Sequence, residues 1–170
     1  MSLVSLKSIK AILFDLDGTL VHSSLNFKQI RQDVACPEGE DVLAFIETLS
    51  PENRVIAGKV IEQHELEDAR SSEIIDGAAE LLKRLAEAGL KTGILTRNSA
   101  EATQIKVQRA GLNIEHILTR EDAPAKPDPR GLLYFSKLWG FKSKECIYVG
   151  DYLYDIQAAI NANMHACFYL

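Results

Sequence analysis

Short apolar runs alternate along the chain with longer segments in which apolar residues recur every three or four positions. The runs are typical of buried β-strands, and the longer spacing is typical of amphipathic α-helices. The pattern predicts strands at residues 10–15, 91–96, 114–119, 145–151 and 165–170. It predicts helices at residues 76–90, 99–111, 128–140 and 154–163. This order is typical of an α/β fold, in which a parallel sheet carries helices on both faces.

Two of the predicted helices carry recognisable start and stop signals. Asp76 and Ser99 stand at their beginnings, and both residue types accept hydrogen bonds from the free N–H groups of a first helical turn. Gly89 and Gly111 stand at their ends, where a residue without a side chain readily takes the left-handed backbone that closes a helix. We therefore expect Asp76 and Ser99 to be the N-caps of these helices.

Residues 20–75 depart from the alternation because they contain no convincing strand. The segment is charged and rich in helix-forming residues, and Pro37 and Pro51 divide it into about three helices. It follows the first predicted strand, so it should stand over the carboxyl edge of the sheet, where open α/β folds bind ligands. The alternative is a segment that only packs on the core. We expect residues 1–19 and 76–170 to form the α/β core, and residues 20–75 to form a smaller helical unit.

Composition narrows the class of protein. The 170 residues are 46% apolar and 25% charged, which is the balance of an ordinary globular domain. The formal net charge of -5 argues against nucleic acid or an anionic membrane as a partner. The three cysteines form no CxxC pair, which argues against a zinc site and a disulfide framework. The chain begins without the apolar stretch of a signal peptide and has no segment of transmembrane length, so we expect a cytoplasmic protein.

Acidic residues follow two of the predicted strands. Asp15 and Asp17 end the first strand, and their spacing places both carboxylates on one face, where they repel each other unless a positive charge lies between them. Asp151 ends the strand at 145–151, and Asp155 follows four residues later. The ends of parallel strands meet at one edge, and a group of carboxylates suits a hard divalent cation such as Mg²⁺. We expect Asp15, Asp17, Asp151 and Asp155 to form a metal site.

The other strand ends supply groups that can hold an anion. The strand at 91–96 ends in Thr96, which is followed by Arg97 and Asn98 and by the start of a helix with free N–H groups. Lys126 precedes Pro127, and a residue before proline adopts extended backbone, which suits a side chain that reaches inward from a loop. We expect Thr96, Arg97, Asn98 and Lys126 to bind a phosphate group beside the metal.

Four motifs carry a family resemblance. The segments "DLDGTL" (15–20), "LTRN" (95–98), "KPDP" (126–129) and "GDYLYD" (150–155) resemble, in order, the four motifs of the haloacid dehalogenase superfamily. The chain is most similar to the phosphatase branch with a small helical cap, of the phosphoglycolate phosphatase type. The resemblance implies a Rossmann-like core with a helical cap inserted after the first motif.

The resemblance also implies a mechanism. Asp15 would attack phosphorus and form an aspartyl-phosphate. Asp17 would protonate the leaving alcohol and then deprotonate the water that hydrolyses this intermediate. Thr96 and Lys126 would hold the phosphoryl oxygens. Asp151 would bind Mg²⁺ together with Asp15 and the backbone carbonyl of Asp17, while Asp155 would orient the site or ligate the ion.

Asp17 decides between the reactions of the superfamily. Family dehalogenases lack an acid at this position because a halide leaves without a proton, whereas an alkoxide needs one. We therefore expect a phosphatase acting on a small phosphorylated metabolite. A phosphomutase and a non-catalytic phosphate-binding module are the alternatives, and the oligomeric state stays open. In the cap, substrate-binding candidates are Lys28, Arg31, Arg54, Lys59 and Arg70, but for each one taken singly we favour a place on the solvated surface. His22 is either a linker residue, which we favour, or a substrate contact.

Overall fold

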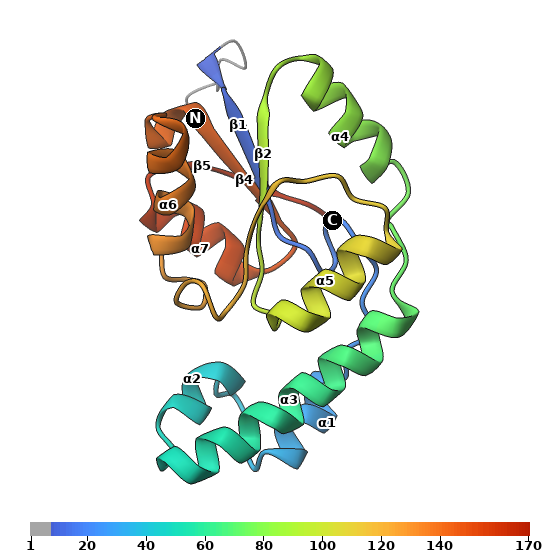
Figure 1. The fold of residues 1–170 in the computed structure, drawn as a ribbon. Coiled ribbons are helices and arrows are strands. Elements are labelled where there is room, and N and C mark those ends of the chain that lie inside the picture. The colour runs from blue at the N-terminus through green and yellow to red at the C-terminus, as the bar shows by residue number, and fades with distance from the viewer. Residues whose placement is uncertain (1–7) are drawn as a thin grey trace.

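The computed structural model describes residues 8–170. The first seven residues, which lie outside the described part, contain the start of the expected core. They also contain the beginning of the N-terminal region in which we expect no signal peptide. The described chain contains a parallel sheet in the order β3-β2-β1-β4-β5 (Figure 1). Its strands are β1 (Ala11–Phe14), β2 (Lys91–Leu95), β3 (His116–Leu118), β4 (Cys146–Gly150) and β5 (His165–Phe168). All five lie within the predicted strand ranges, and the predicted α/β fold class is confirmed.

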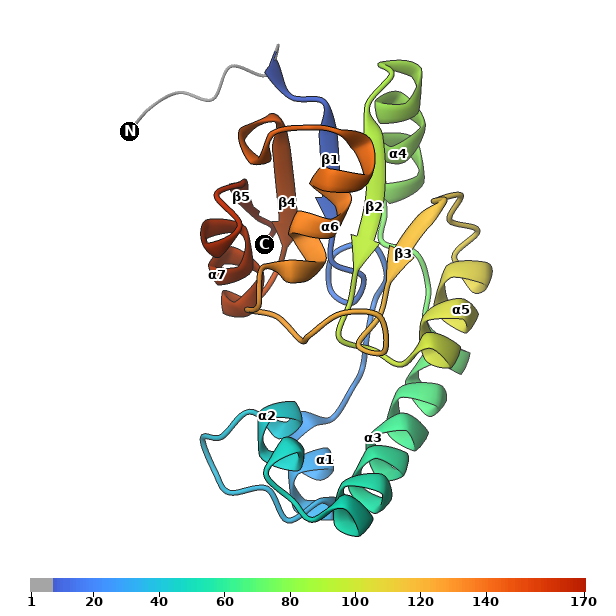
Figure 2. The same ribbon diagram turned by 60° about the vertical axis from the view of Figure 1, so that its left-hand side comes forward.

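Helices cover both faces of the sheet (Figures 1 and 2). On one face, α6 (Arg130–Trp139) and α7 (Leu153–Asn161) bury Leu132, Phe135, Ala158 and Ala159 against β1 and β4. On the other face, α4 (Ala78–Glu87) and α5 (Ala100–Arg109) contribute to a second apolar cluster with β1 and β2. A short 3₁₀ helix (Ser143–Glu145) leads into β4. The sheet therefore lies between two apolar layers, and its strand ends are left to carry polar groups.

The two predicted N-caps had different outcomes. Ser99 caps α5, since its side chain accepts a hydrogen bond from the Ala102 N–H, as predicted. The prediction for Asp76 is wrong. Gly77 is the N-cap of α4, with a φ of 84° and no side-chain cap bond, and the helix begins at Ala78. A backbone in the left-handed region is open to glycine at little cost, and this conformation displaces Asp76 from the capping position.

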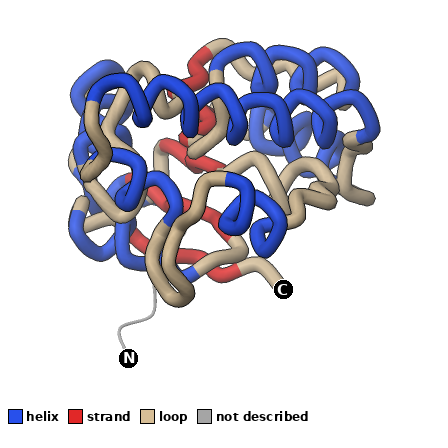
Figure 3. Tube along the Cα trace, turned by 90° about the horizontal axis from the view of Figure 1, so that it is seen from below, coloured by secondary structure: helices blue, strands red, loops and turns tan. Residues whose placement is uncertain are grey.

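Residues 20–75 contain three helices, as predicted: α1 (Phe27–Asp33), α2 (Val42–Glu47) and α3 (Pro51–Ser71). The side chains of Asn26, Asp41 and Ser50 accept N–H bonds at the three helix starts. The helices share an apolar cluster of their own, built from Ile30, Val34, Cys36, Val42, Ile46, Ala57 and Ile61. We call residues 20–75 the inserted segment. It lies beyond the carboxyl ends of the strands (Figures 1 and 2), and Figure 3 views the molecule from that end.

The inserted segment leaves and re-enters the core through two linkers that run side by side. Val21 forms an isolated antiparallel bridge with Ile74. The backbone N–H of His22 donates to the Glu73 carbonyl at 2.8 Å. His22 therefore belongs to the linker, as favoured from the sequence, and its side chain is exposed. None of the described helices is both long enough and apolar enough to cross a lipid bilayer.

Phe135 provides a test of the core. Phe135→Ala should lower the free energy of unfolding by about 3–5 kcal/mol, because its fully buried ring leaves a cavity beside Trp139, whose ring centroid lies 5.3 Å away. The neighbouring Tyr134 is 51% exposed, so Tyr134→Ala is the matched control and should cost far less. Urea denaturation measures both variants. Equal losses would contradict this account of the core.

Candidate active site

The carboxyl ends of three neighbouring strands bring the predicted site residues to one edge of the sheet. In the sheet register, the last residue of β1 lies beside Ile94 of β2 and Val149 of β4. Asp15, the next residue, is therefore level with the ends of both neighbouring strands, which lead to Thr96 and Asp151. The parallel pairing of β1 with β2 and β4 is the reason why motifs far apart in the sequence meet here.

Lys126 lies at the centre of this edge. Its Nζ is 2.8 Å from Asp15 Oδ1 and 2.6 Å from Asp155 Oδ1, and it donates to the Tyr148 hydroxyl at 2.9 Å. Lys126 is 4% exposed and Asp155 is 2% exposed, so these charges meet almost out of water. The ammonium group therefore supplies part of the positive charge that the paired aspartates require.

One positive charge does not balance this group. Burial raises the pKa of Asp15 to about 7, with help from the negative charge of Asp155, although the Lys126 ammonium opposes the shift. Burial by itself would lower the pKa of Lys126, but the carboxylates of Asp15 and Asp155 raise it above its usual value. Lys126 therefore keeps its positive charge, and a further cation beside Asp15 would favour the ionised form of that carboxyl.

Three carboxylates could hold that cation. Asp15, Asp151 and Asp155 each place one oxygen so that the three atoms lie within 4.8 Å of one another. These hard oxygen donors fit a divalent cation of the Mg²⁺ type. Both carboxylate oxygens of Asp155 already have donors, because Oδ1 accepts from Lys126 and Oδ2 accepts from the Tyr152 N–H. Of its two expected roles, this favours orienting the site over ligating the ion. The Asp17 carboxylate lies outside this cluster, and the resemblance relates only its backbone carbonyl to the metal.

Two glycines allow the carboxylates to approach the chain. A Cβ on Gly18 would lie 2.1 Å from Asp151 Oδ2, and Gly18 also has a φ of 72°, in the left-handed region. A Cβ on Gly150 would lie 2.3 Å from Asp155 Cγ. A side-chain carbon at either position would therefore displace a carboxylate from the cluster.

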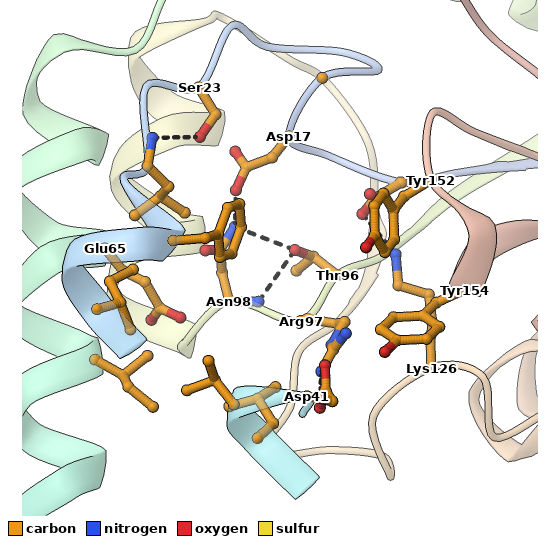
Figure 4. A pocket seen from close by; sticks show the side chains of 18 of the residues that line it. Asp17, Ser23, Asp41, Glu65, Thr96, Arg97, Asn98, Lys126, Tyr152 and Tyr154 are labelled. Atoms are coloured by element: carbon orange, nitrogen blue, oxygen red, sulfur yellow. Dashed lines mark hydrogen bonds and ion pairs between the residues drawn. The ribbon is translucent and has the colours of Figure 1, made fainter. Parts of the chain in front are cut away.

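Asp17 has a separate set of partners (Figure 4). Asn98 Nδ2 donates to Asp17 Oδ2 at 2.7 Å and to Thr96 Oγ1 at 3.2 Å. Lys106 Nζ lies 2.6 Å from Asp17 Oδ1. The side-chain amide of Asn98 is thus engaged with Asp17 and Thr96. Its predicted phosphate-binding role stays a prediction, as do those of Thr96 and Lys126.

Arg97 points to the inserted segment. Its Nη2 lies 2.6 and 2.7 Å from the two carboxylate oxygens of Asp41, and its guanidinium lies 4.9 Å from the centre of the Tyr154 ring. Figure 4 shows this pair next to the phosphate-binding candidates. The structure therefore directs Arg97 to a carboxylate of the inserted segment, and its role in phosphate binding also stays a prediction.

Two further ionic contacts join the inserted segment to the core. Glu65 of α3 pairs with Arg120 Nη1 and accepts a bond from the Ser99 N–H at 3.0 Å. Burial raises the pKa of Glu65, although Arg120 opposes the shift. Asp68 of α3 pairs with Lys106 of α5 at 2.7 Å. Carboxylates of the inserted segment therefore face cations of the core at several points above the sheet edge.

A cavity of about 400 Å³ lies between the strand ends and the inserted segment. On the core side it is lined by the motif residues, among them Asp15, Asp17, Thr96, Lys126 and Asp151. Among the five basic residues of the inserted segment named as candidates, Arg31 lines the cavity. The Nη2 of Arg31 donates to the Glu40 carbonyl at 2.8 Å. The inserted segment also contributes apolar residues, namely Leu25, Phe27, Ile30, Val42, Leu43 and Ile61. The cavity thus has a charged floor and a largely apolar roof.

Sequence reasoning missed Tyr148 and Lys106. Tyr148 is buried, and its hydroxyl accepts from Lys126 and donates to the Leu95 carbonyl at 2.9 Å. A tyrosine inside a buried strand needs a partner for its hydroxyl, and this signal was present in the sequence. Lys106 lies four residues after Ala102, on the inward face of its helix, where a lysine also requires a partner.

Comparisons with known proteins agree with the four motifs. A family model for haloacid dehalogenase-like hydrolases matches residues 9–163. A haloacid dehalogenase-like hydrolase domain-containing protein of Arabidopsis thaliana is 32% identical over 158 residues, which cover 86% of this chain and 64% of that protein. This chain thus spans slightly less than two thirds of the Arabidopsis protein. An N-acetylmuramic acid 6-phosphate phosphatase of Pseudomonas aeruginosa is 29% identical, covering 91% of this chain and 78% of that enzyme.

The fold has solved counterparts. The crystal structure of a hydrolase from Pseudomonas syringae matches with a TM-score of 0.79 and 24% identity, over 92% of this chain and 83% of that one. Family membership comes from the family model, which matches most of the sequence: the chain belongs to the haloacid dehalogenase-like hydrolase family. This membership confirms the family resemblance seen in the motifs, and a phosphatase stands among the relatives that the chain matches.

Gly18 provides a test of the carboxylate cluster. Gly18→Ala should weaken the binding of a divalent cation to the cluster by about 10- to 100-fold, because the added carbon displaces Asp151. Gly89→Ala is the matched control, since Gly89 has a φ of 73° and no atom within 4 Å of an added Cβ. Both variants should lose about 1–2 kcal/mol of stability, because alanine is strained in the left-handed backbone conformation that glycine adopts at both positions. Calorimetric titration with Mg²⁺ separates them, and equal affinities would contradict the placement of Asp151.

Proposed function

We propose that this chain is a Mg²⁺-dependent phosphomonoester hydrolase that acts on a small phosphorylated metabolite through an aspartyl-phosphate on Asp15. The observation that carries the proposal is the pairing of Asp15 with the Lys126 ammonium, while Asp17 lines the same cavity with different partners. Two carboxylates in different surroundings can take different roles in one reaction. The phosphatase named among the relatives supports a phosphorylated substrate.

In the first half of the reaction, a carboxylate oxygen of Asp15 attacks phosphorus and the bond to the leaving oxygen breaks. The leaving alkoxide takes a proton from Asp17, so a neutral alcohol departs. In the second half, the Asp17 carboxylate takes a proton from water as that water attacks phosphorus. The bond to Asp15 breaks, and inorganic phosphate and the free carboxylate are formed.

The other groups at the edge bind and balance charge. Lys126 Nζ and Thr96 Oγ1 would donate to the phosphoryl oxygens, and Lys126 also neutralises Asp15. Asp15 and Asp151 would hold Mg²⁺ with the backbone carbonyl of Asp17, and Asp155 would orient the site. When bound, the ion supplies positive charge that keeps Asp15 ionised and offsets the charge on the phosphoryl oxygens.

The inserted segment would act as a cap. We propose that residues 1–19 and 76–170 form the catalytic core and that residues 20–75 close over the bound ester and exclude water. The cavity of about 400 Å³ supports a compact substrate. In this proposal the apolar lining residues of the inserted segment contact the leaving group, while the strand ends hold the phosphate. These residues are Leu25, Phe27, Ile30, Val42, Leu43 and Ile61.

Asp15→Asn tests the nucleophile. We expect hydrolysis of p-nitrophenyl phosphate to fall by about 10³-fold or more, because an amide oxygen does not replace the attacking carboxylate. The control is Asp76→Asn, an exposed acid outside the cavity lining, which should keep the wild-type rate. Circular dichroism verifies that both variants are folded. A wild-type rate in Asp15→Asn would refute covalent catalysis by this residue.

Removal of the metal tests the cofactor. Dialysis against EDTA should abolish phosphate release, since Asp15 then loses the second cation that its buried position requires. Added Mg²⁺ should restore the rate, whereas Ca²⁺ should restore it poorly because the larger ion prefers more ligands at longer distances. Undiminished hydrolysis after complete chelation would exclude a metal-dependent reaction. Transfer of phosphate between sugar positions, with little release to water, would indicate a phosphomutase instead.

A further inference from the structure

Lys106 is a fully buried cation that the reaction described above does not use. It lies on α5 with no exposed surface, and its Nζ is 2.6 Å from Asp17 Oδ1 and 2.7 Å from Asp68 Oδ2. A lysine is rarely buried to this extent because its charge loses the stabilisation that water provides. The carboxylates of Asp17 and Asp68 replace the stabilisation by water that the Lys106 ammonium loses on burial. The relative positions of the three groups are therefore defined.

Asp68 joins Lys106 to the inserted segment. It lies on α3, and Oδ2 also accepts from the Ser23 hydroxyl at 2.9 Å. Oδ1 accepts from the Ser24 N–H at 2.6 Å and from the Ser24 hydroxyl at 3.0 Å. Ser23 and Ser24 lie in the first of the two linkers, at the start of the inserted segment. Asp68 is therefore held by the linker on one side and holds Lys106 on the other.

These contacts determine where the Asp17 carboxylate lies. Lys106 occupies Oδ1, and Asn98 occupies Oδ2. Lys106 does not line the cavity, whereas Asp17 does, so Lys106 has no direct path to a substrate. Of its two partners, Asp17 leads directly to the reacting groups, while Asp68 leads to the inserted segment.

We propose that Lys106 is a positioning residue for the acid–base role of Asp17, and that Asp68 fixes Lys106 and ties it to the base of the inserted segment. This inference rests on the proposed function of Asp17. Without Lys106, Asn98 would hold only one of the two carboxylate oxygens of Asp17. With Lys106 in place, both oxygens are held, and the side chain keeps one orientation next to the site of the leaving oxygen.

The position of Asp68 extends this effect to the inserted segment. Movement of α3 relative to α5 would pull Asp68 away from Lys106 and release one of the two donors that hold Asp17. The orientation of Asp17 therefore depends on whether the base of the inserted segment is seated on α5. This dependence favours proton transfer when the cavity is assembled.

Leaving-group dependence distinguishes a positioning role from a structural one. Lys106→Met removes the charge at similar length. We expect its kcat for an alkyl phosphate to fall by about 10- to 100-fold, with KM little changed, because an alkoxide requires the proton of Asp17. The loss with p-nitrophenyl phosphate should be a few-fold at most, since p-nitrophenolate leaves without protonation. Equal losses with both substrates, or a loss confined to KM, would overturn the proposal.

Arg109→Met is the matched control. Arg109 lies on the same helix, and its Nε lies 3.4 Å from the Ser72 carbonyl, so this variant also loses a cation and a contact to the end of α3 without touching Asp17. It should show wild-type leaving-group dependence. Adding Lys106→Met to Asp17→Asn should cause no further loss of kcat for the alkyl phosphate, because Lys106 acts through Asp17. A second, multiplying loss in the double variant would contradict that route.

Crystal structures of the variants give a readout that does not depend on activity. In Lys106→Met the Asp17 carboxylate should leave its position beside Asn98, and in Arg109→Met it should stay. If Lys106→Met does not fold, Asp68→Asn carries the same structural and kinetic tests, with smaller shifts in the same direction. An unmoved Asp17 would refute the inference. A wild type that hydrolyses no phosphoester would refute the proposed function, while these structures would still decide the positioning of Asp17.

Discussion

The Nζ of Lys126 lies between Asp15 and Asp155, at 2.8 and 2.6 Å, and the arrangement of the candidate site depends on this contact. The carboxylates converge because parallel strands end at a common edge, and burial makes their negative charges costly without a cation. Tyr148 links the ammonium to the backbone of β2 through the Leu95 carbonyl. The Lys126 ammonium is thereby anchored to the packed sheet, which holds it in place between Asp15 and Asp155.

Charge also governs how the inserted segment sits above this edge. Its three helices share an apolar cluster separate from the two clusters that cover the sheet. The contacts to the core instead include carboxylates of the inserted segment paired with core cations: Asp41 with Arg97, Glu65 with Arg120, and Asp68 with Lys106. Ion pairs made at hydrogen-bond distance require a defined geometry of donor and acceptor. They therefore define one seated position of the helices over the cavity.

The sequence was sufficient for the fold class, the strand positions and the convergence of the acids. These follow from apolar periodicity and from the rule that parallel strands end together, both of which are local or topological. The partners of Arg97 and Lys106 were not predictable in this way. Each contacts a carboxylate of the inserted segment, at Asp41 and Asp68, and nothing in a linear pattern specifies how two helical layers meet.

Gly18 shows a related limit. Its role in turning the chain could be inferred from its residue type, but its second role, leaving room for Asp151, depends on the position of a distant strand end. The error at Asp76 is of the same kind, because a favourable capping residue was overridden by the left-handed backbone of Gly77. Local preferences identify candidates, and the tertiary structure decides among them.

The paired linkers have a consequence for how such a molecule can diversify. The chain leaves the core and returns to it at adjacent points, where Val21 meets Ile74, and the helices between carry their own apolar cluster. Mutations that reshape the roof of the cavity are thus largely uncoupled from the stability of the sheet. Evolution, or an engineer grafting a different helical module onto the same two stems, can alter the molecules admitted while the reacting groups stay unchanged, as long as the module keeps the Asp68 carboxylate beside Lys106.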